Sequence, residues 1–246
     1  MFDLSGKIAF ITGGAGDLGK SMAMALGRAG ASIIMAGVDN EDKVTAVEKE
    51  FERENLKVRF EYMDVSVVSQ VESVISAHPD IEILINCAGV NIRKPILDIT
   101  EKDWEKVIDV NLKGVFFSSR TAAKNMLARG KGKIINMASL SSHLGLPNMG
   151  PYCASKGGVN QLTKAMAIEW APCIQVNAIA PGYFQTELTE VLFRDEAWKN
   201  KVLSRIPAGR TGYPNDLNGL VVFLASDAAD YITGQTIYAD GGWTAS

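Results

Sequence analysis

The strongest constraint on the fold is a regular alternation between short apolar runs and longer stretches with helical periodicity. In chain order, the apolar runs are KIAFIT, SIIMAG, VRFEYM, IEILINCAG, GKIINMAS, IQVNAIA and TIYAD. They are largely continuous in apolar residues and do not alternate with polar ones, which is typical of strands in a sheet covered on both faces. Strands that alternate with helices lie parallel and are joined by right-handed crossovers. The pattern therefore predicts a parallel β-sheet between two layers of helices.

The stretches between the runs define the expected helices. Helical periodicity covers residues 17–29, 41–54, 67–77, about 101–127, 152–170 and about 214–225, with an irregular stretch to about 205. No linker, repeat or low-complexity segment divides this series. We therefore expect an α/β fold, a single Rossmann-like doubly wound parallel sheet of about seven strands with helices on both faces. One domain is expected to cover residues 1–246.

Composition excludes several classes of protein. The chain of 246 residues has a formal net charge of −3 and no long basic run, so a nucleic acid is not an expected partner. No stretch reaches the roughly 18 apolar residues of a membrane span, and the amino-terminal sequence lacks a signal-peptide pattern. Cys87, Cys153 and Cys173 form no CxxC motif. We therefore expect a cytoplasmic protein without a metal site and without a membrane partner.

A glycine-rich turn follows the first apolar run. The sequence TGGAGDLG at 12–19 lies between a predicted strand and a predicted helix, where free N–H groups at a helix amino terminus can bind phosphate. Two registers are open. One is the dinucleotide fingerprint GxGxxG over 14–19; the other starts at Thr12-Gly13 and leaves Asp17 in the position of a glycine. A carboxylate that faced a pyrophosphate would be repelled by about 4 kcal/mol per charge pair.

A second group of residues lies in the middle of the chain. Ser139 ends the run GKIINMAS, and Tyr152 and Lys156 are four residues apart on one face of a predicted helix. A free tyrosine has a pKa near 10, and general acid–base catalysis at neutral pH needs a lower value. A nearby lysine ammonium would lower the pKa of the phenol, and a serine hydroxyl can hold a substrate oxygen. These residues are the expected catalytic centre, at the strand ends where such sheets bind ligands.

Several motifs jointly carry a family resemblance. They are TGGAGDLG, NCAG at 86–89, VNLKG at 110–114, Ser139, YCASK and NAIAPGYFQT at 177–186. From about Lys7 to Gly242 the chain resembles the short-chain dehydrogenase/reductase family. The resemblance implies that Tyr152 is the general acid/base and that Lys156 lowers its pKa and binds the nicotinamide ribose. It also implies that Ser139 orients the reacting carbonyl or hydroxyl, that Asn111 supports a proton-relaying water, and that the protein is a homotetramer.

The same resemblance selects the register that starts at Thr12-Gly13 and makes Asp17 a departure. We expect Asp17 to cap backbone N–H groups at the start of its own helix, with its carboxylate turned away from the phosphates. A weakened pyrophosphate site is the alternative. The expected cofactor-binding residues are Thr12, Gly13, Gly14, Gly16, Asp17, Leu18, Gly19, Asp39, Asp64, Val65, Asn86, Ala88, Gly89, Tyr152, Lys156, Pro181, Gly182, Phe184 and Thr186.

The expected dinucleotide is NAD, with NADP as the alternative. An NADP site would need a basic residue just beyond the second strand or inside the glycine turn. The sequence MAGVDNED offers none, and its acids would repel a 2′-phosphate. Asp39 can accept hydrogen bonds from ribose hydroxyls; an aspartate that caps a turn or a helix is the other interpretation.

A mobile substrate flap is expected at about 183–210, where aromatic and charged residues follow one another without periodicity. Within the family, AGVNIRKPILDITEKDW, NAIAPGYFQTEL and RIPAGRTGYPNDLNGLVVFLASDAADYITGQTIYADGGW resemble the gluconate 5-dehydrogenase and 2-deoxygluconate dehydrogenase branch. The implied reaction interconverts a secondary alcohol and a ketone of a sugar acid or polyol by hydride transfer with NAD(P). Arg93 is a candidate partner for a substrate carboxylate and His143 for a hydroxyl; solvated loop residues are the alternative for both.

Two other functions remain open. A 3-oxoacyl thioester reductase would use the same catalytic residues, but it would prefer NADPH and need a basic docking patch, of which Arg129, Lys131 and Lys133 are a faint version. Outside the enzymes, a non-catalytic regulatory protein that binds a nicotinamide dinucleotide is the alternative. The intact catalytic set argues against it.

Overall fold

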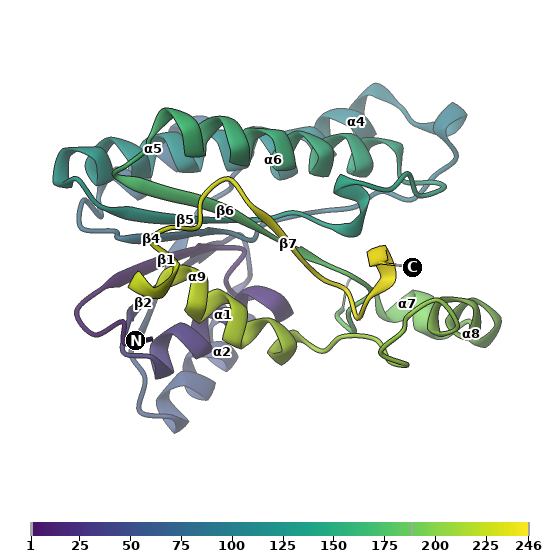
Figure 1. Ribbon diagram of the computed structural model, residues 1–246, viewed down its shortest axis with the longest axis horizontal. Coiled ribbons are helices and arrows are strands. Elements are labelled where there is room, and N and C mark those ends of the chain that lie inside the picture. The colour runs from purple at the N-terminus through teal and green to yellow at the C-terminus, as the bar shows by residue number, and fades with distance from the viewer. Residues whose placement is uncertain (1, 188, 246) are drawn as a thin grey trace.

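The computed structural model of the protein describes residues 2–187 and 189–245. A seven-stranded sheet in the order β3-β2-β1-β4-β5-β6-β7 forms its centre, and each neighbouring pair of strands is parallel (Figure 1). The strands are β1 (Ile8–Thr12), β2 (Ser32–Gly37), β3 (Val58–Tyr62), β4 (Ile83–Asn86), β5 (Gly132–Met137), β6 (Ile174–Pro181) and β7 (Thr236–Ala239). The expected doubly wound parallel sheet is confirmed.

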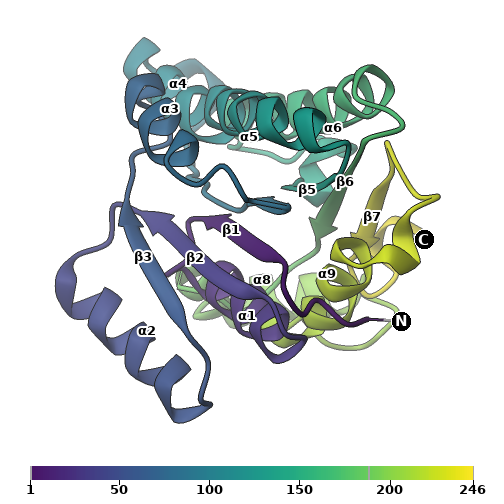
Figure 2. The ribbon, with the colours of Figure 1, turned by 90° about the vertical axis from the view of Figure 1, so that its left-hand side faces the viewer.

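The helices form two layers, one on each face of the sheet, as Figure 2 shows. One face is covered by α3 (Val68–Ser76), α4 (Glu101–Ile108), α5 (Gly114–Arg129) and α6 (Gly150–Glu169), and the other by α1 (Asp17–Arg28), α2 (Glu41–Arg53) and α9 (Asn218–Ala225). Among the described residues, no helix combines the length and the apolar character that a membrane crossing requires.

The central strands bury side chains on both faces. Phe10 of β1 shares a core cluster with Leu84 on the side of α3 and α5, whereas the next residue, Ile11, shares one with Ile85 on the side of α1 and α9. All four side chains are fully buried. Because successive strand residues point to opposite faces, burial on both sides requires the continuous apolar runs of the sequence.

The strand order reverses between β1 and β4. These strands are neighbours although β2 and β3 separate them in the sequence. From β1 the chain builds outward to β3, returns to β4 beside β1, and then builds in the opposite direction to β7. Open α/β sheets bind ligands in the crevice at the carboxyl ends of such a pair of strands.

The helix expected over 101–127 is interrupted in the structure. It consists of α4 and α5, joined by a π-helical turn at Asp109–Lys113. The sequence-based expectation of one continuous helix is therefore wrong at this point. Single π-helical turns occur frequently at functional sites, and this one contains Asn111, which is fully buried.

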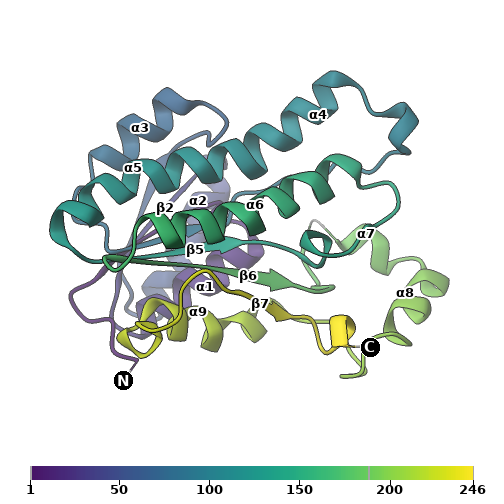
Figure 3. The same ribbon diagram turned by 45° about the horizontal axis from the view of Figure 1, so that its top comes forward.

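The irregular stretch to about 205 contains two short helices. They are α7 (Glu190–Phe193) and α8 (Glu196–Leu203), which project beyond the carboxyl edge of the sheet (Figure 3). Asp195 begins α8 by accepting the backbone N–H groups of Ala197 and Trp198, a capping signal that sequence reasoning did not use.

Candidate functional site

One side chain ties the carboxyl ends of β1 and β4 together. Thr12 Oγ1 accepts hydrogen bonds from the backbone N–H groups of Cys87 (3.1 Å) and Ala88 (3.2 Å). Thr12 is itself buried. The contact brings the glycine turn against the NCAG segment and forms the floor of the crevice.

Close approaches of the backbone explain the glycines in the turn. Gly13 has a φ of +64°, and a Cβ atom there would lie 2.8 Å from the backbone of Ala88. A Cβ atom on Gly19 would overlap with the carbonyl oxygen of Gly13, whereas a Cβ atom on Gly16 would approach nothing more closely than 3.4 Å. A Cβ atom on Gly14 would lie 2.5 Å from Met35 Cβ. The steric requirement therefore falls on Gly13, Gly14 and Gly19 and not on Gly16, the middle glycine of GxGxxG, which agrees with the register that starts at Thr12-Gly13.

Two adjoining cavities form a cleft in this crevice. A cavity of about 240 Å³ is lined by Gly13, Gly16, Asp17, Leu18, Gly19, Asp39, Cys87, Ala88, Gly89, Thr186 and Glu187. A neighbouring cavity of about 490 Å³ shares several of these residues and adds Asp64 and Val65. The first N–H groups of α1 have no partner within the helix. A glycine cradle that a Cβ atom would fill, next to a helix amino terminus, fits the pyrophosphate of a dinucleotide.

Most of the expected cofactor-binding residues line this cleft or the adjoining catalytic cavity, but Thr12, Gly14 and Asn86 are buried behind its wall. Asn86 Nδ2 donates to Asn136 Oδ1 at 2.8 Å and to Ser119 Oγ at 2.9 Å. The side chain therefore joins β4, β5 and α5 inside the core. Its expected place in the wall around the adenosine ribose stays a prediction.

Asp17 does not cap its own helix, so that expectation is wrong. The N-cap residue of α1 is Gly16, and no side chain caps the helix. Asp17 Oδ2 instead accepts the backbone N–H of Glu187 at 2.7 Å, from a position 170 residues away in the sequence. The Asp17 carboxylate thus forms its hydrogen bond with a distant segment of the chain and not with the start of its own helix.

Ser139, Tyr152 and Lys156 line one cavity of about 140 Å³. Ser139 follows β5, while Tyr152 and Lys156 lie in the first turns of α6. The Ser139 hydroxyl lies close enough to the Tyr152 phenol to favour its ionised form. Lys156 Nζ lies 5.7 Å from the centre of the Tyr152 ring. Pro181, Gly182, Phe184 and Thr186 complete the wall of the cavity.

Burial dominates the titration of this centre. Desolvation raises the pKa of the Tyr152 phenol, and the hydrogen bond with Ser139 and the charge of Arg93 oppose the rise. The net direction is opposite to the lowering expected from the sequence, because desolvation exceeds the opposing contributions. Lys156 Nζ donates to the carbonyl oxygen of Met137 at 2.6 Å, and desolvation lowers the pKa of Lys156 to about 8. Lysine at this position can thus exchange protons near neutral pH.

Asn111 is held on the π-helical turn by the segment that follows β4. Its Oδ1 accepts the Val90 N–H at 2.8 Å, and its Nδ2 donates to the Val90 carbonyl oxygen at 2.9 Å. Nδ2 also donates to Ser155 Oγ at 3.2 Å. A Cβ atom on Gly89 would lie 3.5 Å from Asn111 Oδ1 and 3.8 Å from Lys156 Nζ. The amide and the ammonium therefore face the same stretch of backbone, and the role of Asn111 in proton relay stays a prediction.

The two candidate substrate residues lie on exposed loops. Arg93 follows β4, and its positive charge acts on the phenols of Tyr152 and Tyr183, so it lies near the mouth of the catalytic cavity. His143 is exposed directly after the short turn Leu140–Ser142 that follows Ser139. The structure thus places both residues on segments that leave the carboxyl edge of the sheet.

Sequence reasoning missed an aromatic cluster beside Arg93. The Tyr183 ring packs edge-on against Trp198 (5.4 Å between ring centres) and Trp243 (4.9 Å). The Arg205 guanidinium lies 4.2 Å from the centre of the Trp243 ring. No acidic side chain of the described residues is ion-paired with Arg93 or Arg205. Two guanidinium groups are therefore available beside one phenol.

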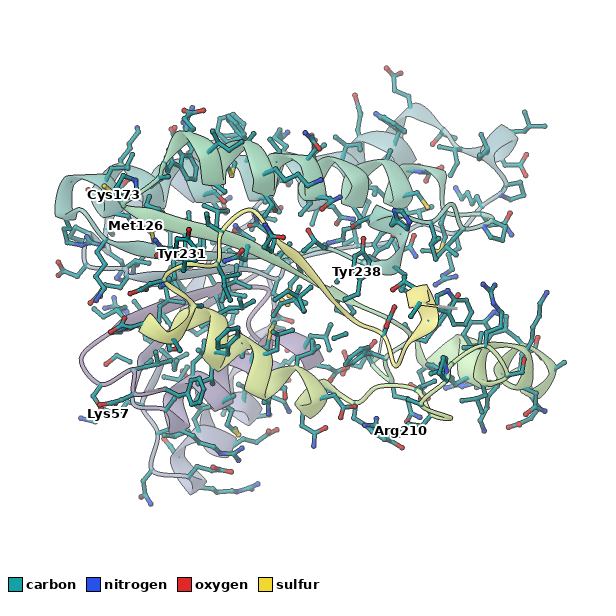
Figure 4. The ribbon with its side chains drawn as sticks, in the orientation of Figure 1. Lys57, Met126, Cys173, Arg210, Tyr231 and Tyr238 are labelled. Atoms are coloured by element: carbon teal, nitrogen blue, oxygen red, sulfur yellow. The ribbon has the colours of Figure 1, made fainter. Side chains whose placement is uncertain are left out.

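A further cavity of about 290 Å³ adjoins this cluster and is lined by residues that include Tyr183, Arg210 and Tyr238, the last two labelled in Figure 4. Arg210 is committed to a two-point ion pair with Asp216 (2.6 and 2.9 Å). Over residues 2–187 and 189–245, no group of three His, Cys, Asp or Glu side chains is placed to hold a metal ion.

Comparisons with known proteins extend over nearly the whole chain. A sequence-family model described as Enoyl-(Acyl carrier protein) reductase matches residues 13–244. The chain is 43% identical over 250 residues to the 2-dehydro-3-deoxy-D-gluconate 5-dehydrogenase of Escherichia coli (strain K12), covering 99% of this chain and 98% of that one. It is 39% identical over 251 residues to the gluconate 5-dehydrogenase of Gluconobacter oxydans (strain 621H), covering 100% and 98%. The crystal structure of a gluconate 5-dehydrogenase from Burkholderia cenocepacia J2315 in complex with NADP and tartrate is similar, with a TM-score of 0.95, 40% identity and coverage of 100% and 98%.

Proposed function

Because this chain belongs to the short-chain dehydrogenase/reductase family and is an NAD(P)-dependent oxidoreductase that acts on CH–OH groups, we propose that it interconverts the hydroxyl and keto forms of a sugar acid. The observation that carries the proposal is that Ser139, Tyr152 and Lys156 line one cavity beside the carboxyl end of β5. That cavity adjoins the cleft whose glycine turn fits a dinucleotide.

The chain's own residues would handle the proton and the orientation of the substrate. Tyr152 gives a proton to the substrate oxygen in reduction and takes one in oxidation, and Ser139 holds that oxygen by a hydrogen bond. Lys156 has a pKa of about 8, close to neutral. It supplies a proton to the Tyr152 phenolate after reduction and takes one from the phenol after oxidation. A nicotinamide dinucleotide, when bound, supplies or accepts the hydride. Asn111, which faces the same backbone as the ammonium, is proposed to connect it to solvent.

A sugar acid is favoured over a neutral polyol by the charges at the mouth of the cavity. The relatives named above are described as dehydrogenases of gluconate or of a deoxygluconate derivative. Arg93 and Arg205 lie near Tyr183, and their positive charges act on its phenol. A guanidinium binds a carboxylate with two parallel hydrogen bonds. We propose Arg93 and Arg205 as the partners of the substrate carboxylate, and His143 as a contact for a hydroxyl.

The alternative of a 3-oxoacyl thioester reductase loses its docking patch in the structure. Arg129 donates to the carbonyl oxygens of Pro79 and Ile81. Lys133 Nζ lies 2.6 Å from Asp230 Oδ1, and Lys131 Nζ lies 3.7 Å from Asp227 Oδ1. The three cations are thus paired within the chain, at the opposite end of β5 from Ser139.

The position of Lys43 bears on whether the protein binds NAD or NADP. Sequence reasoning favoured NAD because no cation directly follows β2, but Lys43 Nζ lies 3.2 Å from Asp39 Oδ1 at the edge of the cleft. A similar solved structure holds NADP, so the preference for NAD has no support from relatives. We propose that Asp39 contacts the ribose and that Lys43 allows a 2′-phosphate to bind beside it.

Three further proposals concern the domain organisation, the oligomeric state and the cellular compartment of the protein. We propose one catalytic domain with a substrate flap at about 183–210, where α7 and α8 lie. We propose a homotetramer in which a second copy covers the apolar groove between α5 and α6, lined by Leu112, Phe116, Phe117, Leu162 and others. The free cysteines fit the reducing cytoplasm that we propose as its compartment. Light scattering tests the oligomeric state.

The function is tested with Tyr152→Phe, with turnover followed by the absorbance of the reduced nicotinamide. The wild type is screened with NAD and NADP against aldonates, polyols and their keto forms. Loss of the phenolic proton should lower kcat by about 10²- to 10⁴-fold, while dinucleotide affinity, measured by fluorescence, stays within about twofold because the ring remains. The control is Tyr231→Phe, whose side chain is fully exposed.

Full turnover by Tyr152→Phe would refute the proposed role of the phenol. A wild type that binds a dinucleotide but turns over none of these substrates would favour the non-catalytic alternative. Turnover of 3-oxoacyl thioesters with no aldonate activity would favour the thioester reductase.

A further inference from the structure

The Asp17 carboxylate spans the dinucleotide cleft. Asp17 is the first residue of α1, and its Oδ2 accepts the Glu187 N–H at 2.7 Å. Both residues line the cavity of about 240 Å³ into which the amino terminus of α1 opens. The hydrogen bond therefore joins two segments of the cavity lining that are far apart in the sequence.

A second contact supports the first. Lys43 Nζ lies 3.4 Å from Glu187 Oε2 and 3.2 Å from Asp39 Oδ1. Asp39 lines the same cavity as Glu187. Glu187 is thus held through its backbone by Asp17 and through its side chain by Lys43. Both partners come from the chain between β1 and β3, on the far side of the cleft.

The segment that Asp17 holds has internal hydrogen bonds of its own. The Thr186 N–H donates to Thr189 Oγ1 at 3.0 Å, and the Glu190 N–H donates to the Thr186 carbonyl oxygen at 2.9 Å. Thr189 Oγ1 also donates to the Phe184 carbonyl oxygen at 2.5 Å. Because these bonds tie Thr186 to Thr189 and Glu190, a restraint on the neighbouring Glu187 also restrains Thr186, which lines both the cleft and the catalytic cavity.

The residue type at position 17 matters for this contact. Glycine offers no side-chain acceptor, and the amide oxygen of asparagine is a weaker acceptor than a carboxylate. One oxygen of the Asp17 carboxylate is committed to the Glu187 N–H.

We propose that Asp17 is a positioning residue that latches the Thr186-Glu187 segment over the dinucleotide cleft and slows dinucleotide release. The inference rests on the proposed function for the identity of the ligand. The latch itself is a contact of the protein chain and can be measured without any ligand.

The test compares wild type with Asp17→Ala, Asp17→Asn and Glu190→Gln. Glu190→Gln is the matched control, since it removes one carboxylate from the same segment, where Glu190 pairs with the exposed Arg194. Hydrogen–deuterium exchange of peptides that cover 182–190 is measured on the ligand-free protein. The rate of NADPH release is measured by stopped-flow fluorescence. Thermal unfolding verifies that each variant is folded.

Both rates should rise in the order wild type, Asp17→Asn, Asp17→Ala, with Asp17→Ala about tenfold faster than wild type and Glu190→Gln within about twofold of it. Any other order overturns the latch. In particular, slower release from both Asp17 variants would show that the carboxylate faces the phosphates. If the wild type binds neither NADPH nor NADH, the proposed function fails, and the exchange rates still decide whether Asp17 restrains the segment.

Discussion

The ammonium of Lys156 donates a 2.6 Å hydrogen bond to the carbonyl oxygen of Met137, the last residue of β5. Only 4% of Lys156 is exposed. A carbonyl dipole compensates a buried charge less than a carboxylate does. Desolvation therefore lowers the pKa of Lys156 from its usual 10.5 to about 8, and the folded protein holds this proton less tightly than the unfolded chain.

Lys156→Met should remove a pH dependence from stability. Between pH 8 and 10.5 the unfolded chain binds more protons at this lysine than the folded protein does, so the wild type gains stability as the pH rises through this window. From about pH 7 to about pH 9.5, the free energy of unfolding of the wild type should rise by about 2 kcal/mol relative to the variant. Urea unfolding at both pH values measures the difference. Lys199→Met, at a half-buried lysine of α8 that pairs with Glu196, serves as the control, and an equal rise in both variants would contradict the assignment.

Gly13→Ala should destabilise the protein and weaken dinucleotide binding. A side chain at φ +64° is strained, and its Cβ atom would lie 2.8 Å from the Ala88 backbone. We expect the free energy of unfolding to fall by about 2–3 kcal/mol. Gly219→Ala is the matched control, because a Cβ atom there meets nothing within 4 Å and should raise stability by about 0.5 kcal/mol. Chemical unfolding and fluorescence titration measure both effects, and equal stabilities of the two variants would refute the steric explanation.

Local periodicity and spacing were sufficient to predict the sheet and to bring Ser139, Tyr152 and Lys156 to one cavity. The apolar runs reflect burial on both faces of each central strand, as Phe10 and Ile11 illustrate. The interval of four between Tyr152 and Lys156 places them on one helix face, and Ser139 follows the adjacent strand. These features depend on neighbours in the sequence, so the sequence carries them directly.

Features that depend on distant segments were not predictable in the same way. Asp17 looks like a helix cap locally, but its partner Glu187 comes from the flap. The direction of the Tyr152 pKa depends on how much of the phenol the flap and the strand ends desolvate. The contact between Arg205 and Trp243 depends on how the segment after α8 packs against the carboxyl-terminal residues. No interval within the sequence encodes such contacts.

Lys43→Met should shift the choice of dinucleotide toward NAD. If the ammonium beside Asp39 meets the 2′-phosphate, its loss should weaken NADP affinity by about 10- to 100-fold, whereas NAD affinity should change by less than about threefold. Fluorescence titration with both reduced dinucleotides gives the ratio. Glu187→Gln is the control, because it removes the other ion pair of Lys43 and leaves the ammonium in place. An equal loss for both dinucleotides would mean that Lys43 acts on the flap alone.

Arg205→Met should separate substrates that carry a carboxylate from those that do not. The Arg205 guanidinium lies over Trp243, which packs against Tyr183, and the charges of both Arg93 and Arg205 act on the Tyr183 phenol. Loss of one charge-assisted contact should lower kcat/KM for an aldonate by about 10- to 100-fold, mainly through KM. The value for the corresponding alditol should change by less than about twofold, since it has no charge to bind.

Arg93→Met should give a similar loss, and the double variant should lose less than the product of the two single losses if both groups hold one carboxylate. Lys201→Met is the control, because it removes a cation from α8, which ends shortly before Arg205. A comparable loss in Lys201→Met would mean that the substrate responds to the general positive charge of the flap. Equal losses for the aldonate and the alditol would mean that Arg205 supports the flap and does not bind the carboxylate.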